Sequence, residues 1–223
     1  PGTVHQDLLN NELIEDPLEN NNEKNLKWIE KENWEYKSKW NVNQDLYAND
    51  HVLLVFNGLD TYASVYLNDS LILQSDNMFR TWKAEVKHLL RVGENDLEII
   101  FTSPLIFNRE YVLRLPYQLP SGNEDVDLKV SSFTRKAAYQ FGWDWGPRFV
   151  TSGIWRDIKL VATNKARIDN VYVKQELVSE QLAKLTFQIS LQHFTAFKGL
   201  INIHCHNVGG ITQQTPVNLT TDN

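Results

Sequence analysis

One carboxylate between two indoles is the feature of this sequence best suited to chemistry. Residues 142–146 read Gly-Trp-Asp-Trp-Gly. If this segment and Phe141 before it are extended, Phe141, Trp143 and Trp145 share one face and Asp144 points the other way. A carboxylate can accept two hydrogen bonds from neighbouring sugar hydroxyls, and an indole combines an apolar body with a polar tip. The pattern therefore indicates a sugar contact, and it equally suits an aromatic-rich turn that closes a β-sandwich.

Two clusters that could ligate a metal have simpler interpretations. His204 and His206 share one face of a predicted strand, as zinc ligands can, but Cys205 points to the opposite face. A polar strand face explains this pair. An acidic group lacks the spacing and the glycine of a calcium loop, and we interpret it as a solvated loop: Glu124, Asp125 and Asp127. The sequence therefore predicts neither a metal site nor a cofactor.

Composition narrows the class of protein. The chain has 223 residues, of which 42% are hydrophobic and 11% aromatic, as in a globular domain with a real core. Its net charge of −6 argues against nucleic acid or an anionic membrane surface as a partner. The single cysteine, Cys205, excludes an internal disulfide, so the redox compartment cannot be inferred from it.

Short strands separated by polar turns predict an all-β sandwich for the first part of the chain. Thr3 and Gln6 have the spacing of a capping box, which predicts a helix over 7–11. A second short helix is expected over 105–110, within a long irregular stretch. The expected strands are 33–42, 51–56, 61–67, 71–73, 79–86, 97–102 and 157–162.

A second domain is expected to begin after 163, where residues 163–165 read Thr-Asn-Lys and the strand pattern then restarts. Strands are expected over 171–176, 183–191 and 200–206. An immunoglobulin-like sandwich needs about seven strands and about 100 residues. We therefore expect a jelly-roll domain over 1–163 and, over 164–223, the start of an immunoglobulin-like sandwich that is cut off before completion.

Residues 135–155 resemble a signature of the β-mannosidases of glycoside hydrolase family 2. The likeness is carried by 135–136, 141–149 and 153–155. Further blocks match in the family's order: 1–5 with 7–9, 22–23 with 28–29, 34–36, 59–61 with 67–68, and 76–80. The resemblance is strong over 1–165 and weak beyond. It implies a galactose-binding-like jelly roll and a retaining glycosidase that needs no cofactor.

The resemblance also implies where catalysis does not occur. Both catalytic glutamates of the family lie in a (β/α)8 barrel, a fold of about 250 residues with alternating strands and helices. This sequence contains no such alternation, so no catalytic residue is assigned to it. The loop around Asp144 would act as a lid on the barrel. Asp144 would accept hydrogen bonds from a terminal mannose, and Trp143 would pack on the sugar. Trp145 would contact sugar or belong to the core, and Arg148 and Arg135 would brace the loop.

The sequence therefore predicts the N-terminal part of an exo-β-mannosidase that hydrolyses terminal β-linked mannose and is inactive without its barrel. Its partners would be a β-mannoside and the enzyme's own barrel, with neither nucleic acid nor membrane. A free-standing carbohydrate-binding module and a purely structural sandwich are the alternatives. Family members that act on galactosides, glucuronides or glucosaminides share the layout. A closer likeness to bacterial than to lysosomal members implies a periplasmic or secreted enzyme.

Overall fold

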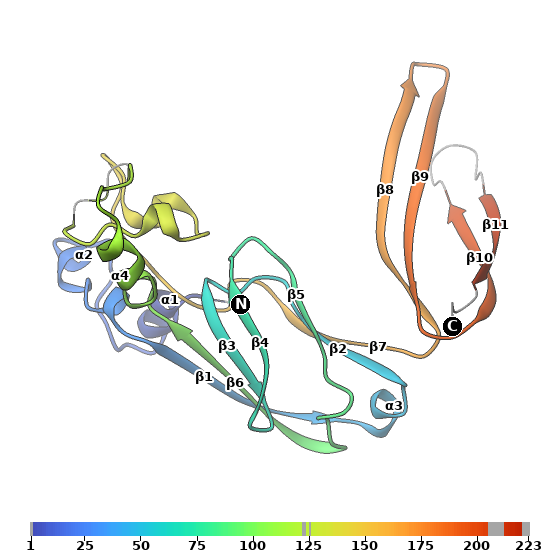
Figure 1. Ribbon diagram of the computed structural model, residues 1–223, viewed down its shortest axis with the longest axis horizontal. Coiled ribbons are helices and arrows are strands. Elements are labelled where there is room, and N and C mark those ends of the chain that lie inside the picture. Colours follow the sequence, from blue (N-terminus) through green and yellow to red (C-terminus); the bar gives the residue numbers. More distant parts are fainter. Residues whose placement is uncertain (1, 122–123, 125, 205–211, 220–223) are drawn as a thin grey trace. The chain divides into compact units, whose positions relative to one another are not determined.

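The computed structural model describes residues 2–121, 124, 126–204 and 212–219. The chain divides into two compact units, 1–162 and 163–223, which are described here one at a time (Figure 1). Strands in antiparallel pairs dominate both units, so the predicted all-β class is confirmed. Within the described residues, no helix is both long and apolar enough to cross a membrane.

Two sheets form the first unit (Figure 1). The four-stranded sheet has the order β1-β6-β3-β4, with antiparallel neighbours, and the other has the order β5-β2-β7. Each predicted strand of this unit has a counterpart near its expected position. The bounds are β1 Trp34–Val42, β2 His51–Phe56, β3 Tyr62–Leu67, β4 Ser70–Asp76, β5 Trp82–Glu85, β6 Gly93–Thr102 and β7 Ile158–Thr163.

The core of this unit lies between the two sheets. Side chains of β6 alternate between buried and more exposed positions, so that Leu97, Ile99 and Phe101 point inward. From the other sheet, Leu54 and Phe56 of β2 meet them in one cluster. At the connection between β3 and β4, Asn68 and Asp69 have φ of 48° and 67°, as in the type I′ turns that favour these residues.

The short helices lie outside this core. Helix α4 and the loops around α2 gather at one end of the sandwich, and α3 lies at the other (Figure 1). The α-helices are α1 Val4–Asn10, α2 Asn22–Asn25, α3 Gln44–Tyr47 and α4 Pro104–Arg114. The 3-10 helices are η1 Ile29–Lys31, η2 Ser131–Phe133 and η3 Ala138–Phe141.

Both predicted helices are present, but their ends differ from expectation. The Thr3 side chain makes no capping hydrogen bond, so the predicted capping box is wrong. The backbone N–H groups of Gly2 and Val4 instead donate to the carbonyls of Ile154 and Ser152, which holds this segment against a distant loop. Helix α4 begins at Pro104, where the Ser103 hydroxyl accepts from the Leu105 N–H, and it extends four residues past its predicted end, to Arg114.

The described residues of the second unit form two antiparallel strand pairs, β8–β9 and β10–β11. In the first hairpin, the cross-strand pairs Val173–Phe187 and Val171–Ile189 place apolar side chains on one face. The strands are β8 Ala166–Val178, β9 Ala183–His193, β10 Phe197–His204 and β11 Thr212–Leu219. Strand β11 was not predicted. The proposed His204–His206 pair cannot be assessed because His206 and Cys205 lie outside the described residues.

Candidate functional site

The segment 143–146 forms a tight turn with Asp144 and Trp145 at its corner. The Trp143 N–H donates to the Gly146 carbonyl (3.2 Å), and the Gly146 N–H donates to the Trp143 carbonyl (3.3 Å). Trp143 is 48% exposed and Trp145 is 85% exposed, and Asp144 is also exposed. All three predicted site residues therefore lie on the surface, where a ligand could reach them.

This geometry corrects the extended conformation predicted for 141–145. Phe141 ends the 3-10 helix η3, and Gly142 follows with φ of 101°, which turns the chain before the tight turn begins. Phe141 is 2% exposed and packs with Val130 and Val150 in a small core of its own. The three aromatic residues thus do not share a face, and the exposure of Trp145 excludes a core role for it.

A hollow of about 510 Å³ lies beside the turn. Both indoles of the turn contribute to its wall, whereas Asp144 does not line it. The lining is aromatic and uncharged and consists of Tyr139, Gln140, Trp143, Trp145, Gly146, Pro147 and Phe149. The turn therefore presents two chemically different surfaces, an acidic one at Asp144 and an aromatic one in the hollow.

Arg148 anchors the end of the loop that carries the turn. Its Nη1 donates to the Phe141 carbonyl (2.9 Å), which closes the base of the loop. Its guanidinium pairs with Glu30 (2.9 Å) and Glu124 (3.3 Å), and all three side chains are buried. The backbone N–H of Arg148 also donates to the Glu23 carboxylate (2.9 Å). The predicted bracing role of Arg148 is thus confirmed.

The same contacts correct the interpretation of the acidic group. Glu124 is 2% exposed, and its carboxylate also accepts the N–H groups of Val130 and Ser131, so it is no part of a solvated loop. Burial raises the pKa of Glu30, and the charge of Arg148 opposes this shift. Asp125 lies outside the described residues. Among the residues described, no group of three or more acidic, histidine or cysteine side chains could hold a metal.

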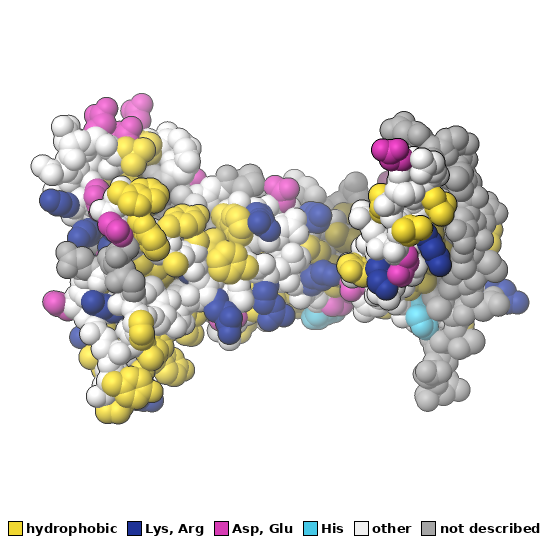
Figure 2. All heavy atoms as spheres, turned by 90° about the horizontal axis from the view of Figure 1, so that it is seen from above, with side chains coloured by type: hydrophobic (Ala, Val, Ile, Leu, Met, Phe, Trp, Pro, Cys, Tyr) yellow, Lys and Arg dark blue, Asp and Glu magenta, His cyan; other side chains and the backbone are white. Residues whose placement is uncertain are grey.

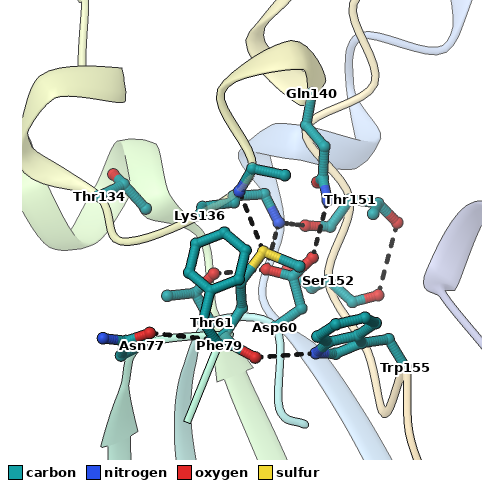
Figure 3. A network of polar contacts seen from close by, with 12 residues as sticks. Asp60, Thr61, Asn77, Phe79, Thr134, Lys136, Gln140, Thr151, Ser152 and Trp155 are labelled. Carbon is teal, nitrogen blue, oxygen red and sulfur yellow. Dashed lines mark hydrogen bonds and ion pairs between the residues drawn. The ribbon is translucent and has the colours of Figure 1, made fainter. Parts of the chain in front are cut away.

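Asp60 anchors the start of the loop (Figure 3). Its carboxylate accepts hydrogen bonds from Lys136, Gln140 and Thr61. Lys136 also donates to the Thr151 carbonyl (2.7 Å), so one buried ammonium joins three separate segments. Burial lowers the pKa of Lys136 to about 8, although the neighbouring Asp60 carboxylate opposes the shift.

Sequence reasoning missed these anchors. Asp60 lies 76 positions before Lys136, and Glu30 lies 118 positions before Arg148. No local pattern marks such pairs. The available signal was a lysine and an arginine within an apolar, glycine-rich stretch, because buried cations need carboxylate partners.

Arg135, which was also expected to brace the loop, has an exposed side chain. Its backbone carbonyl accepts the Met78 N–H (3.1 Å).

His5 approaches the site from helix α1. Its ring packs edge-on against Phe149, with 5.3 Å between ring centroids, and Phe149 is also one of the residues that line the aromatic hollow. Burial, with a smaller effect of the Lys136 charge, lowers the pKa of His5 to about 4. His5 is therefore neutral at pH 7, and its contact with Phe149 indicates a structural role.

The pKa of His5 predicts a pH-dependent stability. An unfolded histidine has a pKa of about 6.5, so between pH 6.5 and pH 4 the unfolded chain binds more protons than the folded one. The stabilising effect of neutral His5 is present above pH 6.5 and is lost as the pH falls towards 4. From pH 7 to 4.5 we expect the wild type to lose on the order of 2 kcal/mol more than His5→Gln. Urea unfolding followed by tryptophan fluorescence measures this difference, and equal losses would contradict it.

A larger hollow, of about 830 Å³, lies between the edge strands β1 and β7. Core side chains such as Leu54, Ile99 and Leu160 form much of its wall. This hollow is a gap at the open edge of the sandwich. We therefore place the candidate site at the 143–146 turn.

Comparison with known proteins agrees with this architecture. Residues 1–156 match the family model described as "Glycosyl hydrolase 2 galactose-binding domain-like". The chain belongs to glycosyl hydrolase family 2. The resemblance found in the sequence and the predicted galactose-binding-like sandwich are thus both confirmed.

The related proteins of family 2 are much longer than this chain. A β-mannosidase from Capra hircus is 38% identical over 169 residues, which are 74% of this chain and 19% of that protein. A β-mannosidase B from Emericella nidulans is 35% identical over 81% of this chain and 21% of its own length. The chain thus spans about a fifth of these relatives.

Solved structures agree with the sequence comparison. A β-D-mannosidase from Dictyoglomus thermophilum matches with a TM-score of 0.84 and 35% identity, over 99% of this chain and 28% of that one. The exo-chitosanase CsxA from Amycolatopsis orientalis, at 19% identity and a TM-score of 0.68, shares the fold. The match covers 98% of this chain and 23% of the exo-chitosanase chain.

Proposed function

We propose that these residues are the N-terminal part of a retaining exo-β-mannosidase, in which the 143–146 turn contacts a terminal β-linked mannose. Asp144 accepts hydrogen bonds from its hydroxyl groups, and Trp143 and Trp145 pack against it or shape the wall of the pocket. Reactive groups are supplied by a barrel elsewhere in the polypeptide. We further propose that 164–223 begin an immunoglobulin-like sandwich, because the β8–β9 hairpin has an apolar face that further strands would cover.

The observation that carries this proposal is that the exposed turn with Asp144 lies on a loop whose two ends are held by buried ion pairs. Trp143 and Trp145 present large apolar rings to solvent, which costs solvation free energy unless they meet a ligand or another part of the protein. Arg148 and Asp60 hold both ends of the loop. A rigid turn loses little conformational entropy when it binds, so its contacts can contribute to affinity for the transition state.

Among the residues that the structure describes, no accessible pair of carboxyl groups is identified that could carry out hydrolysis. A retaining glycosidase uses two carboxyl groups about 5–5.5 Å apart on either side of the glycosidic bond. Glu30 and Glu124 do converge, but they are buried and both are paired with Arg148. They cannot reach a sugar. Asp144 is therefore a binding residue in this proposal, and the acid and the nucleophile lie in the barrel.

Substitution of Asp144 in the whole enzyme tests the proposal. A hydrogen bond to a charged group contributes about 1.5–3 kcal/mol, so we expect Asp144→Ala to lower kcat/KM for an aryl β-mannoside about 10- to 100-fold. Asp144→Asn keeps the shape and should lose less. Asp127→Ala removes another exposed acid and serves as the control.

The other outcomes separate the alternatives. Unchanged kcat and KM in Asp144→Ala would indicate a purely structural sandwich. Calorimetric binding of mannose by the 223-residue chain, in a protein without glycosidase activity, would indicate a carbohydrate-binding module. Inactivity of the isolated chain towards the aryl β-mannoside, together with activity of the whole protein, is the expected result.

A further inference from the structure

We propose that the aromatic hollow beside the turn binds the leaving-group sugar, the one on the far side of the bond that is cleaved, and that the ring of Tyr139 contacts it. This proposal rests on the proposed function. It assigns a separate task to each side of the turn, with the terminal mannose at Asp144 and the next sugar in the hollow.

The position and size of the hollow support this division. The hollow adjoins the turn through Trp143 and Trp145, yet Asp144 is absent from its wall. Its volume of about 510 Å³ lies within the range of about 300–1,000 Å³ typical of ligand sites. Two linked sugar rings could therefore contact the two surfaces of one turn.

The chemistry of the wall favours a neutral ligand with an apolar face. None of the residues that line the hollow carries a charge, so an ionic ligand would find no counter-charge there. Tyr139 is 70% exposed. The free energy of such an exposed aromatic ring falls when a ligand covers its faces. Figure 2 shows that hydrophobic side chains gather on one face of the first unit. A pyranose ring presents C–H groups that can pack on such rings.

Gln140 holds part of this wall in place. Its Nε2 donates to Asp60 Oδ2 (3.1 Å), and Asp60 also accepts from Lys136 (Figure 3). Because a carboxylate only accepts, the amide cannot rotate to exchange its nitrogen and oxygen. Gln140 Oε1 is shielded from solvent and has no hydrogen-bond partner among the described residues. A ligand in the hollow therefore does not reach this oxygen, and Gln140 stabilises the wall through its hydrogen bond to Asp60.

Two substrates that differ only in the leaving group test the inference in the whole enzyme. A β-linked mannobiose carries a sugar as its leaving group, whereas β-mannosyl fluoride carries none. We expect Tyr139→Ala to lower kcat/KM for mannobiose about five- to tenfold, as the loss of one aromatic contact would. This variant should hydrolyse mannosyl fluoride at the wild-type rate.

Matched variants control for folding and for the acidic surface. Tyr139→Phe keeps the ring and should retain most of the activity on mannobiose. Tyr111→Ala removes an exposed ring that does not line the hollow and should leave kcat/KM unchanged for both substrates. Asp144→Ala should lower kcat/KM for both substrates, because both contain the terminal mannose.

The failures of the two proposals are distinguishable. If Tyr139→Ala lowers kcat/KM equally for both substrates, or for neither, the leaving-group site is wrong, whatever Asp144→Ala does. If Asp144→Ala leaves both substrates unchanged, the proposed function of the turn is wrong. The melting temperature of each variant, measured alongside, shows whether a loss on both substrates comes from unfolding.

Discussion

Replacement of Arg148 by methionine is expected to destabilise the 223-residue chain by about 3–5 kcal/mol, the usual cost of removing one partner of a buried ion pair. The methionine fills much of the space but leaves Glu30 and Glu124 facing each other without their shared cation. The Phe141 carbonyl also loses its donor. Because this bond closes the base of the loop, the 143–146 turn should become mobile as well.

Urea unfolding measures this effect, and two variants make it specific. Arg114→Met removes an exposed ion pair with Glu110 and should cost at most about 0.5 kcal/mol. Adding Glu30→Gln and Glu124→Gln to Arg148→Met removes the unpaired charges and should restore part of the stability. An Arg148→Met variant as stable as Arg114→Met would show that the buried triad is energetically unimportant.

Replacement of Asp60 by alanine should have an effect of similar size, about 3–5 kcal/mol, at the start of the loop. It leaves the Lys136 ammonium buried without a counter-charge, and Thr61 and Gln140 lose their acceptor. The pKa of Lys136 is already lowered to about 8 by burial, so without Asp60 the lysine should be neutral at pH 7.5. Urea unfolding at pH 7.5 measures the loss.

Two comparisons isolate the charge from the shape. Asp60→Asn keeps the volume and should cost less than Asp60→Ala, because its amide oxygen still accepts from Gln140 or Lys136. The double variant Asp60→Asn/Lys136→Met removes the buried cation and should be more stable than Asp60→Asn alone. If the double variant is less stable than the single one, Lys136 stabilises the fold through the packing of its aliphatic stem and not through its charge.

Local pattern was sufficient wherever strands alternate or turns need special backbone angles. Leu97, Ile99 and Phe101 could be assigned to one face from their spacing, and the structure buries all three. The turn at Asn68 and Asp69 uses residue types that tolerate positive φ. In each case the determining interactions lie within a few residues, so the sequence contains them directly.

The loop that carries the candidate site could not be predicted in this way. The pattern at 141–145 suggests a strand, but burial of Phe141 against Val130 and Val150 holds η3 in its helical turn. Glu124 appeared to belong to a solvated loop until its partner Arg148, 24 positions away, was placed beside it. Burial of a charge depends on a partner that is distant in the chain and near only in the fold.

The sequence by itself determined the sandwich and its strands, because side-chain alternation is a local property. Its aromatic composition also singled out Trp143, Asp144 and Trp145 as candidate site residues. Tertiary structure alone decided that these three lie on an exposed turn, and that Asp144 and the hollow occupy different surfaces. The reason is physical. Two buried ion-paired anchors, Asp60–Lys136 and Arg148 with its glutamates, set the conformation of the loop, and both join segments far apart in the chain.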